Sequence, residues 1–317
     1  MEKGLGVRGQ GLGRRGQGEG AWEKGLGVRG QGLGRRGQGE GVRGWGDRWG
    51  MESAGDFLNY LTYDYVQRAL LVGFLVALCA ALLGVVLILK RFSMIGDGLS
   101  HVGFGAMALA LALHWVPMAL AMPVVMVVAF FLLRLSENSR IKGDTAIAMI
   151  SSASLAIGLL LAGSANVNIN SFLFGNIYTM DKGDAVLGTV LALVVLGIYG
   201  FFYHTVFAVT FDEDFVAAAG APVGLYKTVI GMMAAVIIVV GMRIMGALLI
   251  SSLIIFPGVT AMRLRGSFRG AVGSAAVISV VNFLVGMMAS IVWNLQPGPS
   301  IVLVHTIVFA AVWLAKK

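Results

Sequence analysis

The chain has 317 residues, of which 57% are hydrophobic and 13% charged, and its formal net charge is +8. Soluble domains carry about 25% charged residues, so this composition excludes an ordinary soluble protein and indicates a membrane protein. Residues 1–50 hold ten of the 24 lysines and arginines; 14 basic and 11 acidic residues remain in 51–317, a net charge of +3, which gives no support to nucleic-acid binding.

The first fifty residues are a tandem repeat rich in glycine and arginine. Residues 23–41 repeat residues 2–20 letter for letter. Glycine takes 19 of the 50 positions, and such a segment cannot bury enough apolar surface to fold, so we expect it to be disordered. It also lacks the apolar core of a signal peptide. We expect the functional protein to begin at Met51; the alternative is a real but dispensable tail.

Residues 51–317 contain many apolar runs that approach the ~20 residues a membrane-spanning helix needs. They predict an all-α integral membrane protein, a polytopic bundle of nine transmembrane helices, with eight or ten as alternatives. The predicted runs are 66–89, 92–113, 117–133, 145–163, 185–204, 226–242, 246–262, 271–292 and 300–315.

Cationic residues predict the orientation of these spans, because cytoplasmic loops carry an excess of Lys and Arg. They follow the first, third, seventh and last runs, whereas the loops at 114–117, 165–170 and 293–299 have none. We therefore expect the N-terminus outside and the C-terminus in the cytoplasm.

Two ionisable residues lie in the second span. Asp97 and His101 are four residues apart, which places both side chains on one helical face. Counted from Arg91 at ~1.5 Å per residue, Asp97 lies ~9 Å into the membrane and His101 ~15 Å, near the midplane. Such residues are costly in lipid and usually mark a transport path. The alternative is a structural pair that holds two helices together.

Imidazole and carboxylate are ligands that suit zinc, and manganese accepts them with more oxygen donors. Two ligands in one subunit suit transient coordination of a transported ion better than a closed structural site. His305, inside the last span, is a further metal candidate. A histidine inside a span, like His305, is more often structural than a ligand. The same holds for His114 at an outer loop and for His204 near an inner helix end.

A short cytoplasmic element is predicted between the fifth and sixth long helices, near 211–221. Asp212, Glu213 and Asp214 open an alanine-rich segment that Gly220 closes, which is the pattern of a short helix. It could dock a partner or be an ordinary loop.

The chain lacks the G-x-x-x-x-G-K-[ST] motif and any hydrolytic constellation, so we expect no enzyme activity and no ATP hydrolysis by this chain. The single cysteine, Cys79, lies in an apolar run and predicts packing.

The sequence resembles the zinc and manganese ABC permeases of the ZnuB type over about residues 60–315. The likeness rests on five segments: SMIGDGLSHVGFGAMALA at 93–110, SFLFGNIYTM at 171–180, FDEDFVAAAGAPV at 211–223, MGALLISSLIIFPGVTAMRL at 245–264 and PGPSIVL at 297–303. The tail before Met51 is not part of this pattern.

The resemblance implies an ABC importer permease in the bacterial cell membrane. Its expected partners are a second copy of the chain, two cytoplasmic ATPase subunits and an extracytoplasmic metal-binding lipoprotein. Asp97 and His101 match the family's metal-contacting residues, and the segment with Asp212, Glu213, Asp214, Phe215 and Gly220 matches its coupling helix.

The implied cargo is zinc first, with manganese or iron as alternatives, and the protein would hold no permanent cofactor. A proton-coupled secondary metal transporter is the rival from another class.

Overall fold

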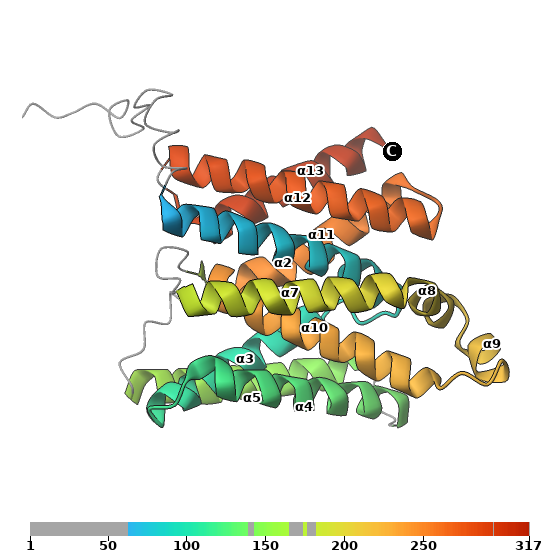
Figure 1. Cartoon of the computed structure of the whole chain (residues 1–317), viewed down its shortest axis with the longest axis horizontal. Coiled ribbons are helices and arrows are strands. Elements are labelled where there is room, and N and C mark those ends of the chain that lie inside the picture. The colour runs from blue at the N-terminus through green and yellow to red at the C-terminus, as the bar shows by residue number, and fades with distance from the viewer. Residues whose placement is uncertain (1–62, 139–142, 165–173, 176–181, 294, 317) are drawn as a thin grey trace, which may run out of the picture. The chain divides into compact units, whose positions relative to one another are not determined.

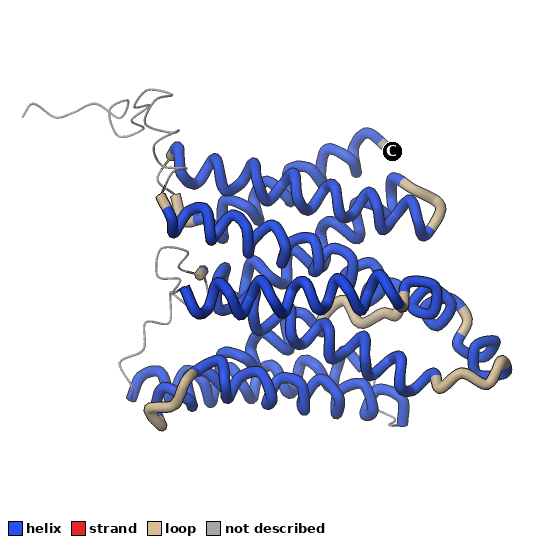
Figure 2. The backbone as a smooth tube through the Cα atoms, viewed as in Figure 1, coloured by secondary structure: helices blue, strands red, loops and turns tan. Residues whose placement is uncertain are grey.

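The computed structural model describes residues 63–138, 143–164, 174–175, 182–293 and 295–316. The described helices belong to one unit, Trp49–Lys317. The expectations for the glycine-rich repeat and for the start at Met51 lie outside the described residues. Within them, Figure 2 shows helices joined by loops and no strand, as an all-α bundle requires.

Eleven helices occupy the described residues. They are α2 (Asp64–Leu89), α3 (Ile95–Ala112), α4 (Pro117–Asn138), α5 (Gly143–Ser164), α7 (Lys182–Phe201), α8 (Tyr203–Phe211), α9 (Glu213–Ala218), α10 (Val223–Met245), α11 (Ala247–Leu264), α12 (Phe268–Val292) and α13 (Pro297–Ala315). The long helices run side by side along one direction, with α8 and α9 at one end (Figure 1).

Nine of these helices are long and apolar enough to cross a bilayer, counted over the described residues. The excluded two are α8 with nine residues and α9 with six. Nine candidate spans confirm the number predicted from the apolar runs.

The second span begins at Ile95, three residues later than predicted. Helix α2 ends in a Schellman turn: Arg91 takes φ 62°, its amide donates to Ile88, and the Phe92 amide donates to Leu87. Residues 92–94 after this turn are not helical, so the distances counted at helical rise from Arg91 do not apply along α3. Measured from the helix start, Asp97 lies ~3 Å and His101 ~9 Å along α3.

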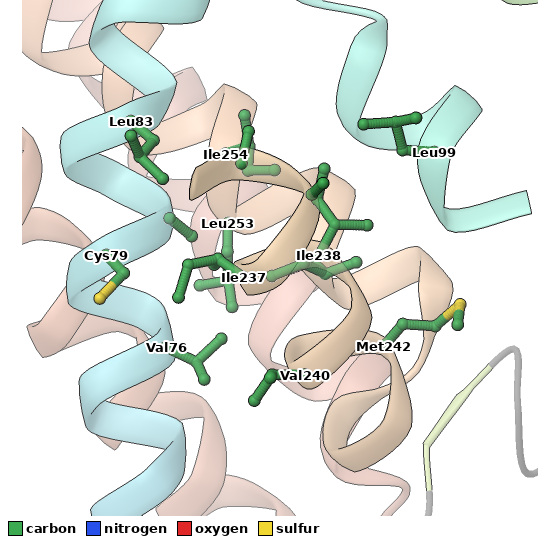
Figure 3. Close-up of a cluster of buried hydrophobic side chains, with 14 of the residues drawn as sticks. Val76, Cys79, Leu83, Leu99, Ile237, Ile238, Val240, Met242, Leu253 and Ile254 are labelled. Atoms are coloured by element: carbon green, nitrogen blue, oxygen red, sulfur yellow. The ribbon is translucent and has the colours of Figure 1, made fainter. Parts of the chain in front are cut away.

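The centre of the bundle is formed by α2, α10 and α11. Val76 and Leu83 of α2 face buried side chains of α10 and α11 (Figure 3), whereas the Sγ of Cys79 donates to the carbonyl of Ala192 in α7. Cys79 is 1% exposed, which confirms packing as its role. Glycines bring these helices close: a Cβ on Gly84 would lie 2.1 Å from the carbonyl oxygen of Ile254.

Candidate functional site

The central feature of the candidate site is the pair that α3 carries in its first two turns. Asp97 lies in the first turn, where the helix dipole favours a carboxylate. His101 follows one turn later, and its Nε2 lies 3.6 Å from Oδ2 of Asp97. The predicted contact on one helical face is therefore present in the fold.

The two side chains differ in access. The Asp97 side chain is 41% exposed and that of His101 17%, so the carboxylate forms the open side of the pair and the imidazole the inner side. Nδ1 of His101 is buried, with no hydrogen-bond partner among the described residues. Buried polar atoms are normally paired, so this nitrogen has unused capacity to bind.

A third side chain lies beside this pair. Ser251 of α11 interacts with the Asp97 carboxylate, and its own Oγ donates to the carbonyl of Ala247 at 3.1 Å. It is 8% exposed. Sequence reasoning missed Ser251, because it lies more than 150 positions from Asp97 and no local pattern links the two.

No group of three or more His, Cys, Asp or Glu side chains able to hold a metal occurs among the described residues. One chain therefore supplies two such donors at this place. His305 does not join them: it is 1% exposed on α13, with Nδ1 3.0 Å from the carbonyl oxygen of Ile301 and its ring 6.5 Å from that of Phe256. Its Nε2 has no partner in the described structure.

The predicted cytoplasmic element is the short helix α9. Asp212 is its N-cap and accepts a hydrogen bond from the Phe215 amide at 2.9 Å. Gly220, with φ 82°, turns the chain after the helix, as its position at the end of the segment predicted. Asp214 and Phe215 are exposed, and Phe215 is 68% accessible. An acidic residue and a large apolar one therefore face outward from α9.

Glu213 points the other way, toward the bundle. Its carboxylate pairs with Lys90 at the end of α2 and with Lys227 of α10. Burial by itself would raise the pKa of Glu213, but the hydrogen bonds and charges of Lys227 and Lys90 outweigh it and hold this pKa below its usual value. The sequence did not indicate either pair, because Lys90 lies 123 positions before Glu213 and Lys227 lies on the next long helix, where no local pattern links it to α9.

Comparison with known proteins relates this arrangement to a transporter family. A family model described as ABC 3 transport family matches residues 62–316. The chain is 30% identical over 245 residues to the high-affinity zinc uptake system membrane protein ZnuB of Buchnera aphidicola, covering 76% of this chain and 94% of that protein. It is 28% identical to the manganese transport system membrane protein MntC of Halalkalibacterium halodurans, covering 80% and 88%.

A solved structure, PsaBC from Streptococcus pneumoniae in complex with Fab, is similar in fold as well. The TM-score is 0.74 at 26% sequence identity, and the match covers 82% of this chain and 95% of the other. The likeness therefore extends over nearly the whole described bundle.

Proposed function

Because the chain belongs to the ABC 3 transport family, we propose that it is the membrane subunit of an importer of divalent transition metal, with zinc as its first cargo. The relatives named for zinc and for manganese support a metal as the substrate. Manganese is the second candidate, and the MntC relative is the observation that favours it.

The observation that carries this proposal is the contact of Asp97 with His101 inside a helix able to span a membrane. A carboxylate and an imidazole in such a helix are costly unless they face a cavity or a partner. Together they are ligands that zinc accepts, and they can replace part of the water that an entering cation loses.

A single chain offers two of the four donors that a tetrahedral zinc site uses. A homodimer with Asp97 and His101 of both copies facing one pathway would supply four. Exchange of some of these donors for water would let the ion leave, which a permease requires and a structural site does not.

The energy for transport comes, in this proposal, from separate ATPase subunits in the cytoplasm. The sequence has no nucleotide-binding G-x-x-x-x-G-K-[ST] motif, and α9 projects from the end of the bundle where Phe215 is exposed (Figure 1). We assign α9 as the docking helix for the ATPase. A metal-binding lipoprotein outside the cell delivers the ion, in a bacterial cell membrane with the N-terminus outside.

The test is metal-limited growth of cells that carry His101→Ala. We expect loss of growth on limiting zinc while the subunit remains folded and at normal level in the membrane. His204→Ala is the matched control, because His204 is exposed on α8 and its loss should leave growth unchanged. Normal zinc uptake by the His101 variant would refute the site. If added manganese, but not added zinc, restored normal growth to cells with this variant, manganese would be favoured as the cargo.

A further inference from the structure

Glu213 lies between the end of α2 and the beginning of α10. Glu213 is the first residue of α9, and its two carboxylate oxygens pair separately: Oε1 with Nζ of Lys90, and Oε2 with Nζ of Lys227. Nζ of Lys90 also donates to the carbonyl of Val209 in α8. One carboxylate thus connects α9 to the end of α2 and to the beginning of α10.

These ion pairs are more shielded than ordinary surface pairs. The side chains of Lys90 and Lys227 are 14% and 21% exposed, against 37% for Glu213. Isolated exposed pairs contribute about 0–1 kcal/mol, but a carboxylate shared by two half-buried cations forms a network. Removal of the Glu213 carboxylate would remove the negative charge that both lysines share.

Apolar packing holds α9 only weakly. Val216 is the one buried residue among the six of this helix, all of which are described. A helix of this length is not stable in isolation. The ion pairs of Glu213 are therefore the main specific connection between α9 and the two long helices.

The two helices that Glu213 connects lead to the two sides of the candidate metal site. Helix α10 reaches α3, where Met242 packs on Gly103, two residues beyond His101. Helix α2 reaches α11 through the contact of Gly84 with Ile254, and α11 carries Ser251 beside Asp97. A joint displacement of α2 and α10 would thus reach Asp97 and His101 through packed helices.

We propose that Glu213 is a positioning residue that latches α9 to α2 and α10 together, so that movement of α9 by the ATPase becomes a joint movement of both helices. This inference rests on the proposed function. It assigns to Glu213 a role in transmission within the subunit, distinct from the outward surface of α9 that would contact the ATPase.

The experiment measures zinc taken up per ATP hydrolysed by the complete transporter in proteoliposomes, with the wild type and Glu213→Gln. We expect the variant to bind the ATPase and hydrolyse ATP, while zinc uptake per ATP falls about tenfold, within the range of coupling between linked sites. Lys227→Met lies outside α9 and should reproduce this loss. The double variant should be little worse than either single one, because both remove the same interaction.

The control is Asp64→Asn. Asp64 forms an ion pair with Arg68 at 3.2 Å, and because both residues lie on α2, this pair does not connect two helices. The ratio of zinc to ATP in Asp64→Asn should equal that of the wild type. Three results would each overturn the latch. The ratio of zinc to ATP could be unchanged in Glu213→Gln, or it could fall in Glu213→Gln but not in Lys227→Met. The third is that Glu213→Gln no longer binds the ATPase. Absence of ATP-driven zinc uptake in the wild type would instead refute the proposed function.

Discussion

At the scale of single residues, the close contact of α2 with α11 depends on Gly84. A Cβ there would lie 2.1 Å from a backbone oxygen of Ile254, which cannot move as a flexible side chain could. We expect Gly84→Ala to destabilise the subunit by about 1–3 kcal/mol, as overpacking does. Thermal unfolding in detergent, followed by circular dichroism, measures this effect.

Gly197 is the matched control, because nothing lies within 4 Å of a Cβ built on it. Gly197→Ala should leave the unfolding midpoint unchanged or raise it, since alanine is the better helix former. Equal midpoints for the two variants would contradict the close contact of α2 with α11.

The spacing of Asp97 and His101 was sufficient to predict their contact, because neighbours at i and i+4 on a helix meet whatever the rest of the fold does. Ser251 and the buried, unpaired Nδ1 of His101 could not be predicted. Both depend on how neighbouring helices pack against α3, and apolar composition does not determine which faces of two helices meet.

At the scale of elements, the N-cap of α9 should contribute more to the local stability of its helix than an N-cap contributes to a long helix. Asp212 caps a helix of six residues, and its loss in Asp212→Ala should cost about 1 kcal/mol of local stability. We expect amide exchange at Phe215 to become roughly fivefold faster, following that change in free energy.

Ser267→Ala removes the corresponding cap of α12, where Ser267 accepts from the Gly270 amide at 3.3 Å. Because α12 has 25 residues and is packed along its length, exchange at Phe215 should not respond to this variant. Unaltered exchange at Phe215 in Asp212→Ala would show that packing, not the cap, maintains α9.

The attachment of α9 should also depend on pH. Since the pKa of Glu213 is lowered in the folded state, its stabilising contribution is present above the unfolded pKa of about 4.3 and is lost as the pH falls through the folded value. The unfolding midpoint of the wild type should exceed that of Glu213→Gln at neutral pH, and the two should converge in acid. A constant difference across this range would contradict the ionised latch.

The existence of the spans was predictable and their ends were less so. Nine apolar runs sufficed for nine helices, because each had to satisfy its backbone hydrogen bonds inside a membrane. The break after Leu89 was predicted, but the start of the second span was placed at 92 instead of Ile95, because residues 92–94 are as apolar as the helix that follows. The turn itself places a non-glycine residue, Arg91, at positive φ, where glycine is the usual signal.

At the scale of the whole molecule, an odd number of crossings places the two ends of the described bundle on opposite sides of a membrane. The nine candidate spans are therefore compatible with the proposed orientation, N-terminus outside and C-terminus inside. That orientation puts α9, Lys90 and the loop at Arg265 on the cytoplasmic side, where the excess of cations is expected.

The same orientation gives a direct topological prediction. A cysteine placed at Trp115, 61% exposed in the loop after α3, should react with a membrane-impermeant thiol reagent in intact cells. One placed at exposed Arg265 should react only after the membrane is opened. The native Cys79 is buried and should not contribute. The reverse pattern of labelling would show that the subunit has the opposite orientation. Helix α9 would then lie outside the cell, where a cytoplasmic ATPase could not contact it.

Import of metal past Asp97 and His101 can be measured as uptake of radioactive zinc by the purified transporter in proteoliposomes with ATP enclosed. We expect uptake that requires both ATP and the partner ATPase and that His101→Ala abolishes, although that variant still assembles. Equal uptake by the His101 variant, or uptake by this chain alone without ATP, would contradict this expectation.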